Sequence, residues 1–440
     1  GTDNIAIGRV SLEDVTSGHH NISIGHKASL NLTTADNNIA IGEDALGIGI
    51  VTGDKNIAIG TDAGQDMTTG TSNVLMGTTA GSSLLAGSFN VALGFGALDA
   101  SEAASNQVAI GSNAMGTGVV TGATNVAIGA NALLDITSGA RNIALGTGTA
   151  QELTSGFDNV AIGTSAMSTG IVTGYFNIAL GKFALDDITS GTDNIALGKL
   201  AAGNLTTGKS NIAVGSGSMG LGTVTSHDNI AIGNFALEDN TTGGNNIAIG
   251  SGSLANATNN IGNVAIGLEA MGDSVNDGDY NVAIGHLAMH DGDTSGDDNI
   301  AIGQQAGANI SSGTQNIAIG KQAGEALNNG SRNILMGRFS GINVINGYDN
   351  IALGDLSMMN LTAGDNNIAL GRQALYSATT TDIQDNIAIG KHSMKEGVVT
   401  GDNNIGLGSQ TLNNLTSGQS NLAIGSGSMG LGTVTSNDNI

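Results

Sequence analysis

The chain has 440 residues, 40% of them apolar, with 71 Gly, no Pro, Cys or Trp, and a net charge of −24. The apolar share excludes a disordered acidic tail, the absence of Pro excludes collagen, and the absence of Cys excludes disulfides and cysteine-based metal or redox centres. The negative charge argues against nucleic acid as a partner, and apolar runs of about five residues are too short for membrane insertion of this segment.

One short motif, Asn-Ile-Ala-Ile-Gly with small variations, recurs along the whole chain. Taking its Asn as position 0, the first anchor is Asn4 and the last is Asn439, 25 steps later, so the mean spacing is 17.4 residues. A fixed short period predicts a repeat architecture in which each repeat is one structural unit. The anchors, all Asn except Gln107, are residues 4, 21, 38, 56, 73, 90, 107, 125, 142, 159, 177, 194, 211, 229, 246, 263, 281, 299, 316, 333, 350, 367, 386, 404, 421 and 439.

Each anchor predicts one short strand over positions +1 to +3, beginning with 5–7 and 22–24 and ending with 422–424. Positions +1 and +3 always carry Ile, Val, Leu or Met, residues that favour a strand. Position +4 is Gly in all 25 repeats, which allows a turn with positive φ, and the Thr-Ser-Gly segments carry turn chemistry. These fixed breaks leave no room for a stable helix. We therefore predict an all-β, parallel β-solenoid (a β-roll) over residues 1–440, a single continuous array of about 25 coils with one coil per 17–18-residue repeat.

Side-chain alternation along each strand places +1 and +3 on one face and +2 on the other. We expect Ile at +1 and +3 to fill the interior, together with Leu or Met at +8 and the apolar residue before the turn Thr. Position +2 is Ala in 21 of 25 repeats and is expected to face outward, where small side chains let another chain approach closely. Leu75 and Leu335 depart from this pattern and indicate coils whose interface or core is repacked. The Asn column is expected to form a ladder of stacked amides, and +5 is expected to be exposed.

The 18-residue repeats have a signature of their own, and seven of the eight carry Met at +8. Anchors 73, 125, 177, 229 and 281 are each 52 residues apart. Duplication of a three-coil unit explains this longer period, and a lateral contact at every third coil is the alternative. The chain begins and ends in phase with the repeat, which predicts a section of a longer fibre.

The core pattern N-[IV]-A-[IL]-G-x-x-[AS] resembles the head repeat of trimeric autotransporter adhesins, S-V-A-I-G-x-x-[SA]. The longer form NIAIGxxALxxxTSGxxN is similar to repeats in phage tail fibres and related bacterial surface fibres. The resemblance covers residues 4–440. It implies a left-handed roll, a homotrimer and a location outside the cell or on a virion. It also implies a shaft or head that presents a tip for host attachment through an unidentified receptor. The coil here is longer than the adhesin coil by T-[ST]-G-x-x, and the sequence shows no stalk, anchor or chaperone pattern, so virus and cell origin both stay open.

Several local patterns imitate chemical sites. The sequence GSGSMG at 215–220, repeated at 425–430, matches the dinucleotide fingerprint, but a turn sequence follows where that site needs a helix. His286 and His290, and the pair His19 and His20, are interpreted as solvated turn residues rather than metal ligands. The acidic segment 291–299 lacks the Gly-rich calcium repeat and is interpreted as turn chemistry.

Seven of the 13 basic residues occupy position +5, which is interpreted as a solubility feature of an exposed corner; they are Arg9, Lys182, Lys199, Lys321, Arg338, Arg372 and Lys391.

We find no catalytic arrangement, so we predict no catalytic, cofactor-binding or metal-binding residues, no cofactor, and a protein that is not an enzyme. The alternatives to a trimeric fibre are a polymerising extracellular filament subunit and an ice- or surface-ligand-binding solenoid. The latter is disfavoured because Thr and Ser lie beside a Gly turn instead of forming flat rows.

Overall fold

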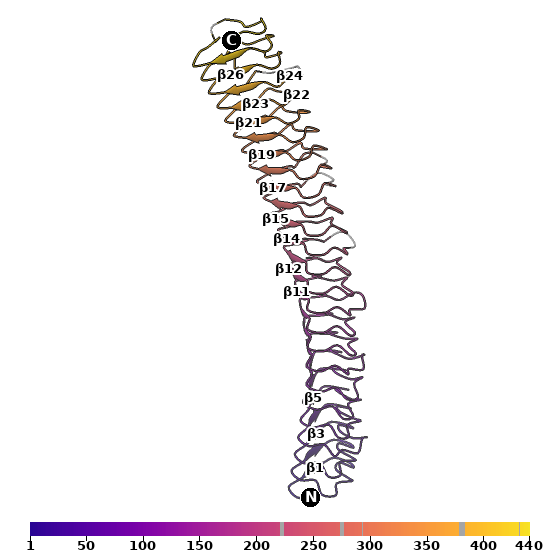
Figure 1. The fold of residues 1–440 in the computed structure, drawn as a ribbon. Coiled ribbons are helices and arrows are strands. Elements are labelled where there is room, and N and C mark those ends of the chain that lie inside the picture. The colour runs from indigo at the N-terminus through magenta and orange to yellow at the C-terminus, as the bar shows by residue number, and fades with distance from the viewer. Residues whose placement is uncertain (221–223, 273–276, 293, 378–382, 431) are drawn as a thin grey trace. The chain divides into compact units, whose positions relative to one another are not determined.

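The fold is a parallel β-solenoid in which one short strand recurs in every coil (Figure 1). A computed structural model describes residues 1–220, 224–272, 277–292, 294–377, 383–430 and 432–440. Every regular element in these residues is a strand, and none of them is helical. The chain divides into two compact units, Gly1–Thr225 and Ser226–Ile440. The predicted all-β class, and the predicted assignment of one coil to each repeat, are confirmed.

Each three-residue strand in the first unit covers positions +1 to +3 of its repeat, as predicted. The strands of this unit are β1 (Ile5–Ile7), β2 (Ile22–Ile24), β3 (Ile39–Ile41), β4 (Ile57–Ile59), β5 (Val74–Met76), β6 (Val91–Leu93), β7 (Val108–Ile110), β8 (Val126–Ile128), β9 (Ile143–Leu145), β10 (Val160–Ile162), β11 (Ile178–Leu180), β12 (Ile195–Leu197) and β13 (Ile212–Val214).

The second unit repeats this arrangement and adds two short strands, β22 and β24, that pair with each other. Its strands are β14 (Ile230–Ile232), β15 (Ile247–Ile249), β16 (Val264–Ile266), β17 (Val282–Ile284), β18 (Ile300–Ile302), β19 (Ile317–Ile319), β20 (Ile334–Met336), β21 (Ile351–Leu353), β22 (Gly364–Asp365), β23 (Ile368–Leu370), β24 (Ile383–Gln384), β25 (Ile387–Ile389), β26 (Ile405–Leu407) and β27 (Leu422–Ile424).

Neighbouring coils within each unit pair in parallel and in equal register. Val74 of β5 lies beside Val91 of β6, and Ile300 of β18 lies beside Ile317 of β19. Backbone hydrogen bonds join the turns in the same way, as from the Thr68 amide to the Leu85 carbonyl, 2.8 Å. Because each coil is bonded to its neighbours along most of its length, the stability of the array depends on stacking rather than on any coil alone.

The two faces of the strand are the reverse of our expectation. Ala at +2 is the inward residue: Ala179 and Ala231, for example, are fully buried within a single chain. The residues at +1 and +3 point outward, and Ile178 and Leu180 of β11 are each 37% exposed. The prediction that Ile232 is interior is therefore wrong. The inner space is already occupied by larger side chains from the rest of the coil, so only a methyl group fits beneath the strand.

Those larger side chains are the ones that the sequence indicated. Leu or Met at +8 is fully buried, as in Leu46 and Met167, and so is the apolar residue before the turn Thr, as in Leu32 and Ile136. The predicted contribution of these two columns to the core is confirmed. The +5 column also lies on the surface, as predicted; Asn234, for example, is exposed.

Leu75 and Leu335 at +2 are explained by glycines on the opposite wall of the coil. A Cβ added at Gly64 or Gly81 would lie 2.8–2.9 Å from a Leu75 methyl, so the Leu side chain occupies the volume that Leu or Met at +8 fills elsewhere. Gly324 and Gly341 stand in the same relation to Leu335, at 2.9 and 2.7 Å. The repacking predicted for these coils is thus in the core.

Replacing Leu335 by Ala should lower the free energy of unfolding of the second unit by about 2–4 kcal/mol. The change removes a buried side chain from a coil whose +8 glycines cannot fill the space. Urea denaturation followed by circular dichroism measures the loss. Leu268→Ala, at a half-exposed +5 position, is the control and should change stability by less than about 0.5 kcal/mol. Equal losses in the two variants would contradict this packing.

The anchor Asn residues form the predicted ladder, and the structure buries it. Asn333 donates from its backbone N, at 3.0 Å, and from its Nδ2, at 3.1 Å, to the Oδ1 of Asn316 one coil before. The same Nδ2 donates to the carbonyl of Gly347, one coil ahead, at 2.7 Å. The Asn333 side chain therefore joins three successive coils and has its donors paired, which is the condition for burying it. Gln107 keeps the ladder continuous, because its Oε1 accepts from the backbone N of Asn125 at 3.1 Å.

Positive φ is not confined to glycine, which the sequence did not indicate. Non-Gly residues take φ near +50 to +60° at three columns, −1, +6 and +8, as at Asp349 (57°), Phe339 (58°) and Met167 (53°). Such values are uncommon for residues with a Cβ. The stacked coils impose these turns, because each one is fixed by hydrogen bonds to the coils on both sides.

Candidate functional surfaces

The outward side chains at +1 and +3 form a continuous apolar face in each unit. We call this surface the strand face; it consists of the +1 and +3 residues of β1 to β13 in the first unit and of β14–β21, β23 and β25–β27 in the second. All of these side chains are half-buried or exposed. Soluble monomers rarely expose contiguous apolar surface on this scale, so the strand face is the first candidate for an interaction site.

Polar columns border the strand face on both sides. We call the residues at −1 the leading edge and those at +5 the trailing edge. Asp is the commonest charged residue of the leading edge, as at Asp298, Asp349 and Asp385, whereas seven basic residues and only two acidic ones, Glu43 and Asp355, lie on the trailing edge. The two edges of one apolar face therefore carry opposite predominant charge.

Ion pairs along these edges join successive coils. Arg332 Nε lies 2.7 Å from Asp349 Oδ1 on the leading edge of the second unit, and Arg338 Nε lies 2.9 Å from Asp355 Oδ1 on its trailing edge. Arg141 and Asp158 form a third such pair, 2.7 Å, in the first unit. All three pairs are solvent-exposed, so each one contributes little to stability by itself.

The ion pairs with arginine lower the pKa of the aspartates that take part in them. The hydrogen bond from Arg332, assisted by its charge and opposed by partial burial, lowers the pKa of Asp349 below its ordinary 3.8. The hydrogen bond from Arg338 likewise lowers the pKa of Asp355, and Arg372 adds to this effect. The pKa of His392 is lowered, chiefly by burial and then by the charges of Lys395 and Lys391. The carboxylates are therefore charged and His392 is neutral at pH 7.

Three of the few aromatic residues gather on neighbouring turns of the first unit. The rings of Phe157 and Tyr175 stack with centroids 4.7 Å apart and an interplanar angle of 4°. The Phe176 ring stands perpendicular to both, and the guanidinium of Arg141 lies 5.7 Å from the Phe157 centroid. Stacking of this kind fixes the turns against one another.

The histidine pairs that the sequence singled out do not form a common site. His286 is exposed at +5, whereas His290 is buried and its Nδ1 lies 2.6 Å from Asp291 Oδ1. His19 Nδ1 is 2.9 Å from the Thr2 amide, and His20 lies 3.6 Å from Asp3. Within the described ranges, no group of three His, Asp or Glu residues is arranged to hold a metal ion.

The two GSGSMG segments are turns of the coil. In the first, Gly215 and Gly217 have φ of 132° and 65°, and their amides donate to the carbonyls of Leu197 and Lys199 in the preceding coil. Residues 221–223, which follow it, lie outside the described residues. In the acidic segment, the Thr294 hydroxyl donates to the Ile310 carbonyl at 3.1 Å, a structural turn contact; Asp293 lies outside the described residues.

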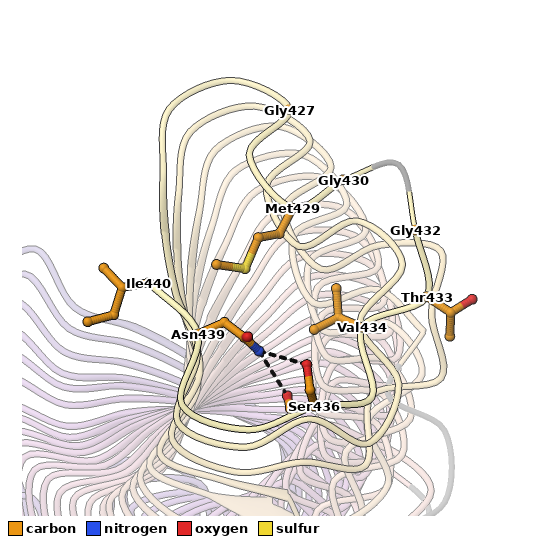
Figure 2. A pocket seen from close by; sticks show the side chains of 9 residues that line it. All are labelled: Gly427, Met429, Gly430, Gly432, Thr433, Val434, Ser436, Asn439 and Ile440. Atoms are coloured by element: carbon orange, nitrogen blue, oxygen red, sulfur yellow. Dashed lines mark hydrogen bonds between the residues drawn. The ribbon is translucent and has the colours of Figure 1, made fainter.

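A cavity of about 540 Å³ lies at the last described coil. Figure 2 shows Met429 and Val434 directed into it, with the Asn439 amide donating to Ser436 Oγ at 2.8 Å beside them. Met429 is at +8 and Asn439 is an anchor, so the lining residues occupy columns that fill the interior of the preceding coils. The cavity is the coil interior viewed end-on, and we do not consider it a separate ligand site.

Nothing in the described part of the chain qualifies as a membrane-crossing helix. The chain matches no protein-family model, and a search of curated proteins finds no relative.

Proposed function

We propose that this protein is a structural extracellular fibre, the shaft or head of a trimeric adhesin or of a phage tail fibre, with a location on a cell surface or virion. Its role would be to hold a host-binding tip at a distance from the surface that carries it. The receptor contacted by that tip is a partner outside this chain. The strand face is the single observation that carries the proposal.

The strand face supports assembly because it gives each chain a long apolar surface to bury. Side chains at +1 and +3 repeat at the strand spacing of about 4.8 Å, and another copy of this solenoid has a surface with the same repeat. Three copies packed around a common axis would cover all three faces and leave none open for further addition. Closed assembly is what separates a fibre of defined length from an aggregating sheet.

The position of this surface corrects our expectation about the interface. Ala at +2 cannot contact another chain, because it is buried inside its own coil. We therefore propose that Ile and Val at +1 and +3 form the contact between chains. The same residues disfavour the ice-binding alternative, since the outward face of the strands is aliphatic rather than a flat array of Thr.

The mass in solution tests the proposal. We expect sedimentation of the intact chain to give three times the chain mass. Replacing Ile178 and Leu180 of β11 by Glu should convert the trimer to smaller species, because six carboxylates would be desolvated together in the centre of the assembly. Circular dichroism should remain that of the β-solenoid, since both side chains point away from the coil interior.

A matched control distinguishes this surface from general apolar exposure. Ile171 is 66% exposed but lies in a turn, away from the strand face. The variant Ile171→Glu should remain a trimer. A monomeric parent would refute trimer assembly, and larger open-ended polymers would favour the filament alternative.

A further inference from the structure

The basic residues of the second unit are concentrated in one segment and on one side of the coil. All six of them lie between residues 321 and 395, whereas residues 226–320 contain 11 acidic residues, residues 396–440 contain 3, and neither range contains a basic one. Five of the six lie on the trailing edge or a few residues beyond it. We call these five the basic stripe: Lys321, Arg338, Arg372 and Lys391 at +5, and Lys395 at +9. The stripe is a local cationic surface on a chain whose net charge is −24.

The +5 members of the basic stripe occupy four of five successive coils and are accessible to solvent. Neighbouring coils are about 4.8 Å apart, so the stripe extends over roughly 20 Å along the stacking direction. The side chains of Arg338 and Arg372 are 59% and 58% exposed, and Lys321 and Lys391 are exposed as well. The stripe is therefore a line of accessible cations and not a buried network of ion pairs.

Acidic side chains neutralise only part of the basic stripe. Asp355, at +5 of the middle coil, lies 2.9 Å from Arg338 and 3.6 Å from Arg372, so two guanidinium groups share one carboxylate. Among the described residues, no carboxylate forms an ion pair with Lys321 or Lys391. The stripe thus keeps positive charge that the protein itself does not compensate.

The cations are densest around His392, at +6 of the coil that contains β25. The pKa of His392 is lowered by burial and then by the charges of Lys395, Lys391 and Arg372. Three positive groups from two adjacent coils therefore act on one imidazole, and Glu396, which pairs with Lys395 at 2.7 Å, offsets one of them. Like charges gathered in this way repel one another, and a bound anion relieves the repulsion.

We propose that the basic stripe binds an acidic polysaccharide whose carboxylate or sulfate groups follow the stacking direction of the coils. Arg372, Lys391 and Lys395 bind one anionic group of the polymer. Arg338 and Lys321 bind groups farther along the same polymer. This inference goes beyond the proposed fibre role, in which the receptor contacts a tip outside this chain, and it does not depend on how many chains assemble.

The distribution of charge favours a sugar polymer over a nucleic acid. In an acidic polysaccharide, uncharged parts of the sugar rings separate the anionic groups, which suits a line of cations interrupted by Asp355. Double-stranded DNA carries one phosphate charge for about every 1.7 Å of its axis. A polymer of that density would place phosphates against Asp355 and against the coils before and after the stripe, which have acidic residues and no cation.

Binding assays with polymers of defined charge test the proposal on the intact chain. We expect the protein to bind polygalacturonate, which carries carboxylates, or dextran sulfate, which carries sulfates, and not to bind neutral dextran. The polymer that binds more tightly identifies the preferred anionic group. High salt should weaken the binding, because the cations of the stripe are exposed and their charge is screened.

A double variant locates the binding on the stripe. Arg372→Gln with Lys391→Gln should raise the dissociation constant of the bound polymer at least tenfold, because it removes two of the three cations around His392. Lys182→Gln with Lys199→Gln is the matched control. It removes the same charge from +5 of two adjacent coils of the first unit, and it should change the dissociation constant by less than twofold. Circular dichroism and urea denaturation should be unchanged in both variants, since all four side chains are exposed.

A change of Asp355 should act in the opposite direction. Asp355→Asn leaves Arg338 and Arg372 without their shared carboxylate and should lower the dissociation constant at least threefold. The variant should remain folded, because exposed ion pairs contribute little to stability. Unchanged or weaker binding by Asp355→Asn would contradict the proposal.

The outcomes separate this inference from the proposed function. No binding to either charged polymer, or equal weakening by the two double variants, would overturn the inference while leaving the assembly measured by sedimentation unaffected. Tighter binding to double-stranded DNA than to both polysaccharides would also overturn it. A parent chain that sediments as a monomer and binds an acidic polysaccharide through the stripe would refute the trimer and support this inference.

Discussion

Replacing Gly198 by Ala should lower the free energy of unfolding of the first unit by about 3–5 kcal/mol. Gly198 is at +4, directly after β12, and has φ of 137°, a conformation that residues with a Cβ rarely adopt. A Cβ at this position would also lie 2.5 Å from the carbonyl oxygen of Gly215 in the next coil. Backbone strain and the steric clash act together, and both neighbours are fixed by bonds between coils.

Gly203, in the same repeat, supplies the matched control. Its φ is not in the positive range, and the nearest atoms to an added Cβ are at 3.5 Å, an ordinary contact. Gly203→Ala should therefore be neutral or stabilising by up to about 1 kcal/mol, because it restricts the unfolded chain. Urea denaturation of the two variants beside the parent measures the difference. If Gly198→Ala were as stable as Gly203→Ala, the +4 column would tolerate a side chain and close stacking would not explain its 25 glycines.

Replacing Ala231 by Glu should have a still larger effect, a loss of more than about 4 kcal/mol and local unfolding around β14. Ala231 is fully buried and pairs with Ala248 of β15, so a carboxylate would enter an interior without a partner. The variant should lose β-structure by circular dichroism and become sensitive to proteases within the second unit.

Two neighbours of Ala231 make this prediction specific to its face. Asn234→Glu lies at the exposed +5 position and should change stability by less than about 0.5 kcal/mol. Ile232→Glu replaces a side chain that is 39% exposed on the strand face, so it should retain the coil while weakening assembly. If Ile232→Glu unfolded the unit and Ala231→Glu did not, the assignment of inner and outer faces would be reversed.

The sequence determined the elements that depend on local geometry. The period of the Asn anchors gave one strand per repeat, with the bounds that the structure has. Gly at +4 marked the turn, and the uniform Asn column predicted an amide ladder. Leu and Met at +8, and the apolar residue before the turn Thr, were predicted to lie in the core, and they do. Each of these conclusions follows because successive coils place residues of the same repeat position directly on one another.

Only the tertiary structure decided which face of the strand is inside. Alternation separates +2 from +1 and +3, but both sets are apolar, so hydrophobicity does not distinguish them. The decision comes from volume: side chains at +8 and before the turn Thr fill the coil and leave room for a methyl group. The sequence indicates the inward face at Leu75 and Leu335. The +8 residues of these two coils, Gly81 and Gly341, are glycines. A large side chain at +2 compensates for a small one at +8 only if both point into the same interior.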